Sequence, residues 1–122
     1  MKRDDQEVAE FRTIFRDLFK QILGETGVKV LEYHFRRISS SDMYVLLSKD
    51  PSEFYKVLTR FFGAGAKAFI RIIASELIVR FGLEDISIGE LMGILMGECD
   101  DSQRRLRELV TRIHARDVGG GP

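Results

Sequence analysis

The sequence predicts an all-α fold: a compact orthogonal bundle of about six short helices around a central apolar helix at about residues 64–81. Three observations support this prediction. Apolar residues recur at intervals of three and four along most of the chain, which is the period of an amphipathic helix. Several of these stretches begin with residues that cap helices. The sequence also lacks the alternation of apolar and polar residues that indicates a half-buried strand.

The N-terminal part of the chain predicts two consecutive helices separated by glycines. The first carries an apolar stripe over residues 8–23, preceded by acidic residues that favour the positive end of a helix dipole. Gly24 and Gly27 then weaken the helix. A second stripe with the same period follows over residues 28–38 and ends in three serines. The next apolar run, residues 43–47, is too short for its period to define a structure.

The middle of the chain predicts an amphipathic helix followed by the central one. Asp50, Pro51 and Glu53 form a capping box with proline at the first helical position, so a helix begins there and ends at Gly63. Residues 64–81 are apolar around most of the helix circumference, which predicts a helix surrounded by the others but too short for a membrane span. The inward-facing residues of the amphipathic helix are predicted to be Phe54, Val57, Leu58 and Phe61.

The C-terminal third predicts two further helices. Gly82 suits the end of the central helix. Ser87 and Glu90 form a second capping box, which opens a helix that reaches about Gly97. A last helix is expected over about residues 101–116.

Length and composition narrow the class of protein. The 122 residues allow one domain, predicted over residues 1–118, with residues 119–122 as a flexible tail. The 19 basic and 19 acidic residues balance, which argues against a protein that coats nucleic acid or anionic membranes over its whole surface. A single cysteine excludes an internal disulfide framework, and the N-terminus lacks the pattern of a signal peptide. We therefore expect a cytoplasmic protein.

Three glycines at intervals of four mark the helix predicted after Ser87. Each glycine in a helix interior costs about 1 kcal/mol relative to alanine, so a close approach by another helix is expected to offset that cost. Either this face packs within the chain, or it forms the seam of a homodimer in which neighbouring methionines add an adaptable apolar surface. The residues of the predicted partner interface are Gly89, Met92, Gly93, Met96 and Gly97.

The last helix is rich in arginine. Its basic residues follow an acidic turn, an order that the helix dipole favours, so a solvated helix face explains them. Arginines clustered on one helix are also typical of contacts with nucleic-acid phosphates, although aromatic residues for base stacking are not interleaved with them. The candidate contacts are Arg104, Arg105, Arg107 and Arg112.

Other chemistry-bearing residues predict neither catalysis nor cofactor or metal binding. His34 and His114 are isolated from one another, and no nucleophile–base arrangement can be placed on one surface. Cys99 would be a reactive thiol if exposed, because a helix N-terminus favours the thiolate. Glu76 interrupts the apolar helix, and we expect it to pair with Arg80 four residues on.

Residues 50–83 resemble a family of small archaeal proteins of unknown function that were proposed as an output domain in signal transduction. The pattern joins a proline, an acid and a phenylalanine to a leucine and a Phe-Gly-x-Gly-Ala-Lys segment. The matching residues are Pro51, Glu53, Phe54, Leu58, Phe62, Gly63, Gly65, Ala66 and Lys67. Ile70 stands where the family often has glutamate, so no site that relies on this acid is implied.

The resemblance implies an archaeal source and a helical fold, and it transfers no catalytic residue. The composition agrees with a thermophilic source, since the sequence has no asparagine and a single cysteine. We expect a non-enzymatic helical interaction or signalling module that acts by self-association, as a homodimer, and by binding a protein partner. A small nucleic-acid-binding regulator that uses the last helix is the alternative. A carrier of a hydrophobic ligand in the helical core is a third hypothesis.

Overall fold

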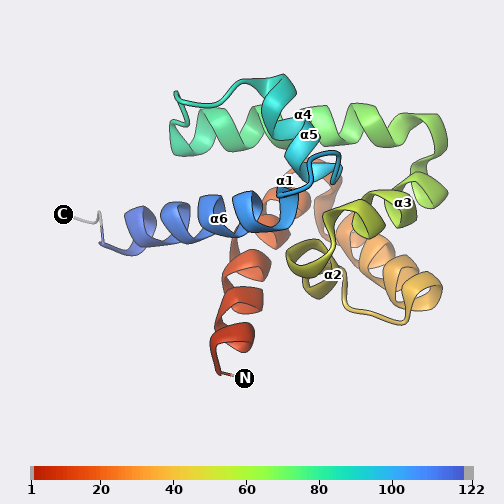
Figure 1. Ribbon diagram of the computed structural model, residues 1–122. Helices are drawn as coiled ribbons and strands as arrows, with labels where there is room; N and C mark the ends of the chain where they lie inside the picture. The colour runs from red at the N-terminus through yellow and green to blue at the C-terminus, as the bar shows by residue number, and fades with distance from the viewer. Residues whose placement is uncertain (1, 120–122) are drawn as a thin grey trace.

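The computed structural model describes residues 2–119, with the side chains of residues 6–115, and within this part of the chain all regular structure is helical. The all-α prediction is therefore confirmed. The helices are α1 (Lys2–Ser39), α2 (Met43–Lys49), α3 (Pro51–Phe62), the short 3₁₀ helix η1 (Gly63–Gly65), α4 (Ala66–Phe81), α5 (Ile88–Leu95) and α6 (Ser102–Gly119). Figure 1 shows α4 along one edge of the molecule and the first half of α1 running across the direction of α6. Residues 120–122 of the predicted tail lie outside the described residues.

The two N-terminal helices of the prediction form one kinked helix, α1. The kink lies at Gly24, whose φ of 83° and ψ of 167° belong to a region that is essentially restricted to glycine. The two halves of α1 therefore run in different directions (Figure 1, red and orange). Buried side chains on the two halves are Phe11, Phe15, Leu18 and Phe19 before the kink and Val28, Leu31 and Phe35 after it.

Polar side chains fix where the middle helices begin. The Asp42 carboxylate accepts hydrogen bonds from two amides in the first turn of α2, at 2.8 and 3.3 Å. Asp50 accepts from the amide of Glu53 at 3.1 Å, and Ser87 accepts from that of Glu90 at 3.1 Å. Half of each predicted capping box is thus formed. The amide of Asp50 donates instead to a carbonyl of α2, and the Glu90 carboxylate binds an arginine of α6.

Stacked aromatic rings form the centre of the core. The ring of Phe15 lies between those of Phe11 and Phe19, at centroid distances of 5.8 and 5.9 Å. Phe19 then contacts Phe69 of α4 at 5.7 Å and Tyr44 of α2 at 6.3 Å. The core is filled by the chain's own side chains, so the structure does not support a carrier of a hydrophobic ligand.

The predicted position of the most apolar helix requires correction. α4 is not surrounded by the others, because Ile72 and Val79 on its outer face remain 47% and 77% exposed. The more central element is α1, which contacts α2, α3, α4 and α6. The hydrophobicity of a helix does not by itself show whether other helices cover both of its faces or only one. The buried face of α4 carries Ala66, Phe69, Ile70, Ile73, Ala74 and Leu77.

Arg80 joins α4 to the first half of α1. Its guanidinium contacts the carboxylate of Asp17 at 2.8 Å and also donates to the side-chain carbonyl of Gln21. The predicted pair between Glu76 and Arg80 is therefore wrong, because α1 supplies a carboxylate and an amide on the side of Arg80. Glu76 is exposed, and no ion pair is found for it within the described part of the chain.

Candidate interaction surfaces

The three glycines of the predicted interface do not share one helical face. α5 ends at Leu95, and Gly97 beyond it has a φ of 71°, which terminates the helix. Two closing hydrogen bonds, from Gly97 to the carbonyl of Ile94 (3.1 Å) and from Glu98 to that of Gly93 (2.9 Å), accompany this conformation. The prediction that the helix reaches Gly97 is wrong for this reason.

Each glycine has a different environment. A Cβ at Gly97 would lie 2.5 Å from Cα and 2.7 Å from Cβ of Ser52, and it would also overlap the Ser52 amide nitrogen. At Gly93 a Cβ would find ordinary contacts with Glu98 and Cys99, at 3.7 and 4.0 Å. Gly89 is exposed and faces open space. Only Gly97 therefore serves a close backbone approach, and that approach lies within the chain.

The two methionines of the predicted interface belong to the core. Met92 is 8% and Met96 7% exposed, so neither offers a surface to a second molecule. Cys99 is half-buried beside them, and its amide donates to the hydroxyl of Ser102 at 3.0 Å. Packing within the chain is the alternative that the geometry favours, and a homodimer requires another surface.

The four candidate arginines of α6 are bound to carboxylates of the same chain. They connect α6 to α1, to α5 and to the loop before α5. Each of the four candidate arginines has at least one such partner, so a nucleic-acid phosphate would have to compete with a resident carboxylate. The closest contacts are Arg104 with Asp101 (2.9 Å) and Glu108 (3.1 Å), Arg105 with Glu90 (2.5 Å), Arg107 with Glu7 (2.6 Å), and Arg112 with Asp85 (3.1 Å).

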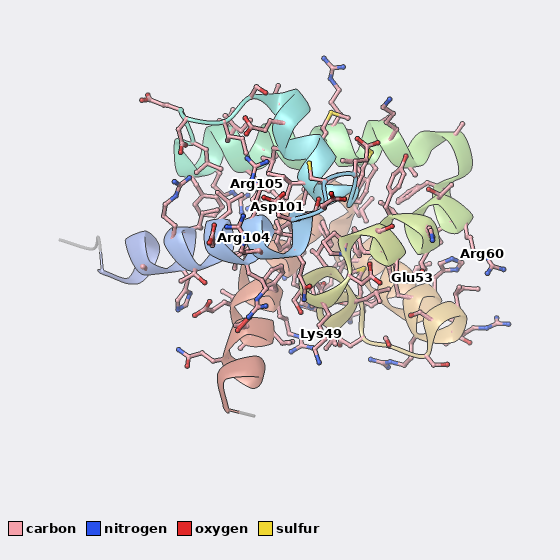
Figure 2. The ribbon with its side chains drawn as sticks, in the orientation of Figure 1. Lys49, Glu53, Arg60, Asp101, Arg104 and Arg105 are labelled. Carbon is pink, nitrogen blue, oxygen red and sulfur yellow. The ribbon has the colours of Figure 1, made fainter. Side chains whose placement is uncertain are left out.

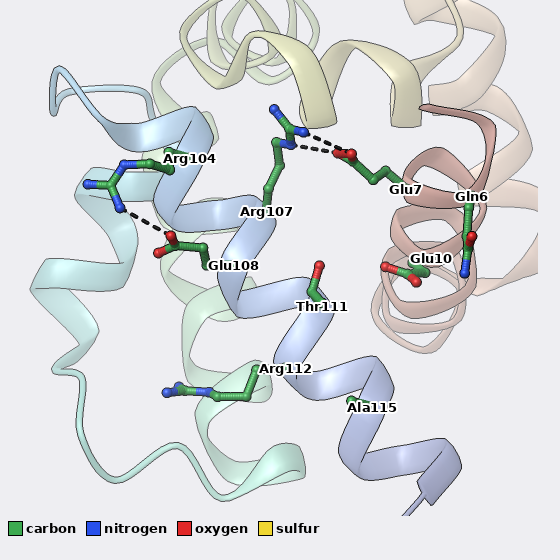
Figure 3. A pocket seen from close by; sticks show the side chains of 9 residues that line it. All are labelled: Gln6, Glu7, Glu10, Arg104, Arg107, Glu108, Thr111, Arg112 and Ala115. Atoms are coloured by element: carbon green, nitrogen blue, oxygen red, sulfur yellow. Dashed lines mark hydrogen bonds and ion pairs between the residues drawn. The ribbon is translucent and has the colours of Figure 1, made fainter. Parts of the chain in front are cut away.

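A groove of about 640 Å³ lies between the N-terminal part of α1 and α6 (Figure 3). Four of its six charged groups pair with one another, Glu7 with Arg107 and Glu108 with Arg104. Arg112 pairs with Asp85, and a carboxylate oxygen of Glu10 lies 3.9 Å from Nε2 of His114. Thr111 contributes the only hydroxyl to the lining, and no histidine is among the lining residues. Across the described residues, no group of three or more His, Cys, Asp or Glu side chains is arranged to hold a metal ion. Most charges of the groove are thus already paired within the chain, which leaves little free charge for a ligand.

A second hollow, of about 350 Å³, lies between the second half of α1 and the end of α3. We call it the aromatic patch. Several of its apolar side chains are unusually exposed, including Tyr33 at 61% and Val30 at 48%. Phe61 was predicted to face inward but is 36% exposed, and its ring packs on that of His34 with centroids 4.8 Å apart. The aromatic patch consists of Val30, Tyr33, His34, Arg37, Ile38 and Phe61.

The environment of the aromatic patch is basic. Arg37 lines it, and Arg60 projects from the same end of α3 (Figure 2), whereas no carboxylate is among its lining residues. Burial lowers the pKa of His34, and the positive charges of Arg60 and Arg37 lower it further. The imidazole Nε2 atom is buried without a hydrogen-bond partner in the described part of the chain. The neutral form of the imidazole is therefore favoured beside the two arginines.

The residues of the aromatic patch come from two distant parts of the sequence, and no local motif predicts that they meet. Val30 and Tyr33 fall between the buried positions of the second stripe, and Phe61 lies about thirty residues further along the chain. They meet because the kink at Gly24 brings the second half of α1 to the end of α3.

Comparisons of the chain with protein-family models, with curated proteins and with solved structures found no match. The resemblance over residues 50–83, the archaeal source and the thermophilic source therefore stay predictions. Within residues 2–119, no helix combines the length and apolar character needed to cross a membrane.

Proposed function

We propose that this protein is a non-enzymatic helical interaction module that acts by binding another protein and by self-association. The observation that carries this proposal is the aromatic patch, where Tyr33, Phe61 and Val30 remain exposed around a hollow. Contiguous exposed apolar surface is typical of interaction sites. Aromatic residues and arginine are also the residues that contribute most to binding at protein interfaces.

The charges around the patch indicate the chemistry of the partner. Arg37 lines the patch, and Arg60 acts with it on the charge of His34. A partner segment with acidic residues around an apolar or aromatic anchor complements this surface. A second copy of the same patch does not, because two-fold packing would bring arginines against arginines.

Peptide binding tests the proposal directly. Two fluorescent peptides of equal length carry the same leucine and phenylalanine anchors, one with glutamate and one with lysine at the remaining positions. We expect fluorescence anisotropy to show binding of the acidic peptide only, and Tyr33→Ser to weaken it by about tenfold or more. Ile88→Ser removes an exposed apolar residue of α5 that lies outside the aromatic patch, and it should leave affinity unchanged. Equal binding of both peptides, or equal loss in both variants, would contradict the proposal.

The nucleic-acid-binding alternative has less support, because its four arginines are already paired. It requires binding to duplex DNA that weakens steeply with salt. We expect no mobility shift of a duplex at low ionic strength, and a salt-sensitive shift that Arg105→Gln and Arg112→Gln abolish would restore this alternative.

A further inference from the structure

The outer face of α4 carries an apolar stripe without a partner in the described part of the chain. Ala68, Ile72, Ser75 and Val79 follow one another at intervals of four, three and four. Ile72 and Val79 are among the most exposed large apolar side chains, at 47% and 77%. Figure 1 places α4 at the edge of the molecule. The exposure of Ile72 and Val79 shows that this face is directed away from the core, which the other side of α4 covers.

The spacing of this stripe is that of a two-heptad coiled-coil seam. Ile72 and Val79 occupy a positions, and Ala68 and Ser75 occupy d positions. β-Branched residues at a are typical of two-helix parallel coiled coils, in which leucine usually occupies d. Small residues at d allow two helix backbones to approach closely, by the same steric argument that applies to small residues between membrane helices.

Two charged residues flank the seam at the positions that select a partner. Arg71 precedes an a residue and is therefore at g, whereas Glu76 follows a d residue and is at e. Both are exposed, and neither has an ion pair within the described part of the chain. In a parallel pair of helices, a residue at g of one helix faces a residue at e of the other helix, and this e residue is five positions further along the sequence. This is the separation of Arg71 and Glu76, so two-fold symmetry would form the pair twice.

We propose that the outer face of α4 is a self-association surface that takes α4 of a second copy of this chain, parallel and in register. An antiparallel arrangement would place g opposite g and e opposite e, so Arg71 at g would not meet Glu76 at e. The partner is therefore specified by charge as well as by the apolar seam. With only two heptads the contact is small, and an interface of this size supports a weak, concentration-dependent dimer.

The inference deepens the proposed function by assigning its self-association to a named surface. The aromatic patch lies on α1 and α3, whereas the seam lies on α4, so each can fail without the other. Val79→Asp should reduce self-association without affecting binding of the acidic peptide. Val30→Asp is the matched control, since it changes another exposed valine, and it should have the opposite pattern.

A charge exchange tests the parallel register. Sedimentation equilibrium at protein concentrations up to about 1 mM would measure dissociation constants in the range expected for a small interface. Arg71→Glu places glutamate opposite Glu76, and Glu76→Arg places arginine opposite Arg71, so each should weaken self-association by about tenfold. The double exchange should restore it, and the two single variants should associate with each other more strongly than either does alone.

Cross-linking tests the orientation independently. In a Cys99→Ser background, Ser75→Cys places a thiol at a d position, where it meets its own copy in a parallel dimer and should form a disulfide under mild oxidation. A dimer that does not cross-link overturns the parallel arrangement. A wild-type protein that remains monomeric up to about 1 mM, or a double exchange that fails to restore association, overturns the proposal itself.

Discussion

Replacing Gly97 with alanine tests the packing between the end of α5 and the start of α3. The substitution has two costs. A non-glycine residue in the left-handed conformation loses about 1–2 kcal/mol, and Gly97 has a φ of 71°. The new methyl group also overlaps Ser52, whose Cα would lie 2.5 Å away. Because this neighbour is backbone, no rotamer change relieves the overlap, and such overpacking costs about 1–3 kcal/mol.

Alanine also restricts the unfolded chain, which offsets about 0.4–1 kcal/mol of these costs. The expected net loss in the free energy of unfolding is therefore about 1–5 kcal/mol, compared with the 5–15 kcal/mol typical of a domain. Urea unfolding followed by circular dichroism measures it as a lower midpoint at unchanged slope.

Two other glycines separate the two costs. Gly82 has a similar φ of 61° but no atom within 4 Å of a built Cβ, so Gly82→Ala should lose about 1 kcal/mol from conformation alone. Gly89 has neither restriction, and Gly89→Ala should be neutral or stabilising by up to about 1 kcal/mol. If Gly97→Ala costs no more than Gly82→Ala, the close approach to Ser52 is refuted.

Two titratable residues supply the remaining predictions. His34→Phe should raise the free energy of unfolding by about 1 kcal/mol, because it removes a buried nitrogen without a partner and keeps the ring contact with Phe61. Because folding lowers the pKa of His34, the unfolded chain binds a proton at higher pH than the folded chain does. The stability of the wild type should therefore fall as the pH decreases below 6.5. Urea midpoints that change with pH identically in His34→Phe would contradict this. Asp42→Ala should cost about 1–2 kcal/mol at pH 7, because the carboxylate caps α2 and binds Arg12. Burial alone would raise the pKa of Asp42, but the hydrogen bonds from Arg12 and two backbone amides lower it below 3.8. The difference in stability between Asp42→Ala and the wild type, measured by thermal or urea unfolding, should therefore disappear only below that pH.

Local chemistry was sufficient to predict most of the helices. The caps at Asp50 and Ser87 and the left-handed glycine at Gly82 each act over a few residues, and the structure uses all three at the predicted places. The short run at 43–47 could not be assigned from its period, yet Asp42 begins a helix there by the same capping chemistry. Signals that act within one helical turn are therefore readable in the sequence.

The positions of surfaces depend on contacts between distant residues. Gly89 and Gly97 are equivalent in a helical pattern, but only the second ends its helix and meets α3. Arg107 was one of a row of similar arginines, and its partner Glu7 is a hundred residues away in sequence. The kink at Gly24, and not any local motif, places Val30 and Tyr33 beside Phe61.

Ion pairing divides the arginines of this chain into two groups. In the described side chains, those of α6, together with Arg12, Arg16 and Arg80, each contact a carboxylate of the same chain. Among the side chains of residues 6–115, the arginines for which no such pair is found are Arg36, Arg37, Arg60 and Arg71.

Three members of the second group lie at the two proposed surfaces, Arg37 and Arg60 at the aromatic patch and Arg71 beside the α4 seam. Although the net charge of the chain is zero, its arginines thus have two roles. Some form ion pairs that stabilise the fold, and others remain available to a partner. Carboxylates that bind this molecule should accordingly approach α1, α3 or α4, and the basic sequence of α6 should contribute little to binding.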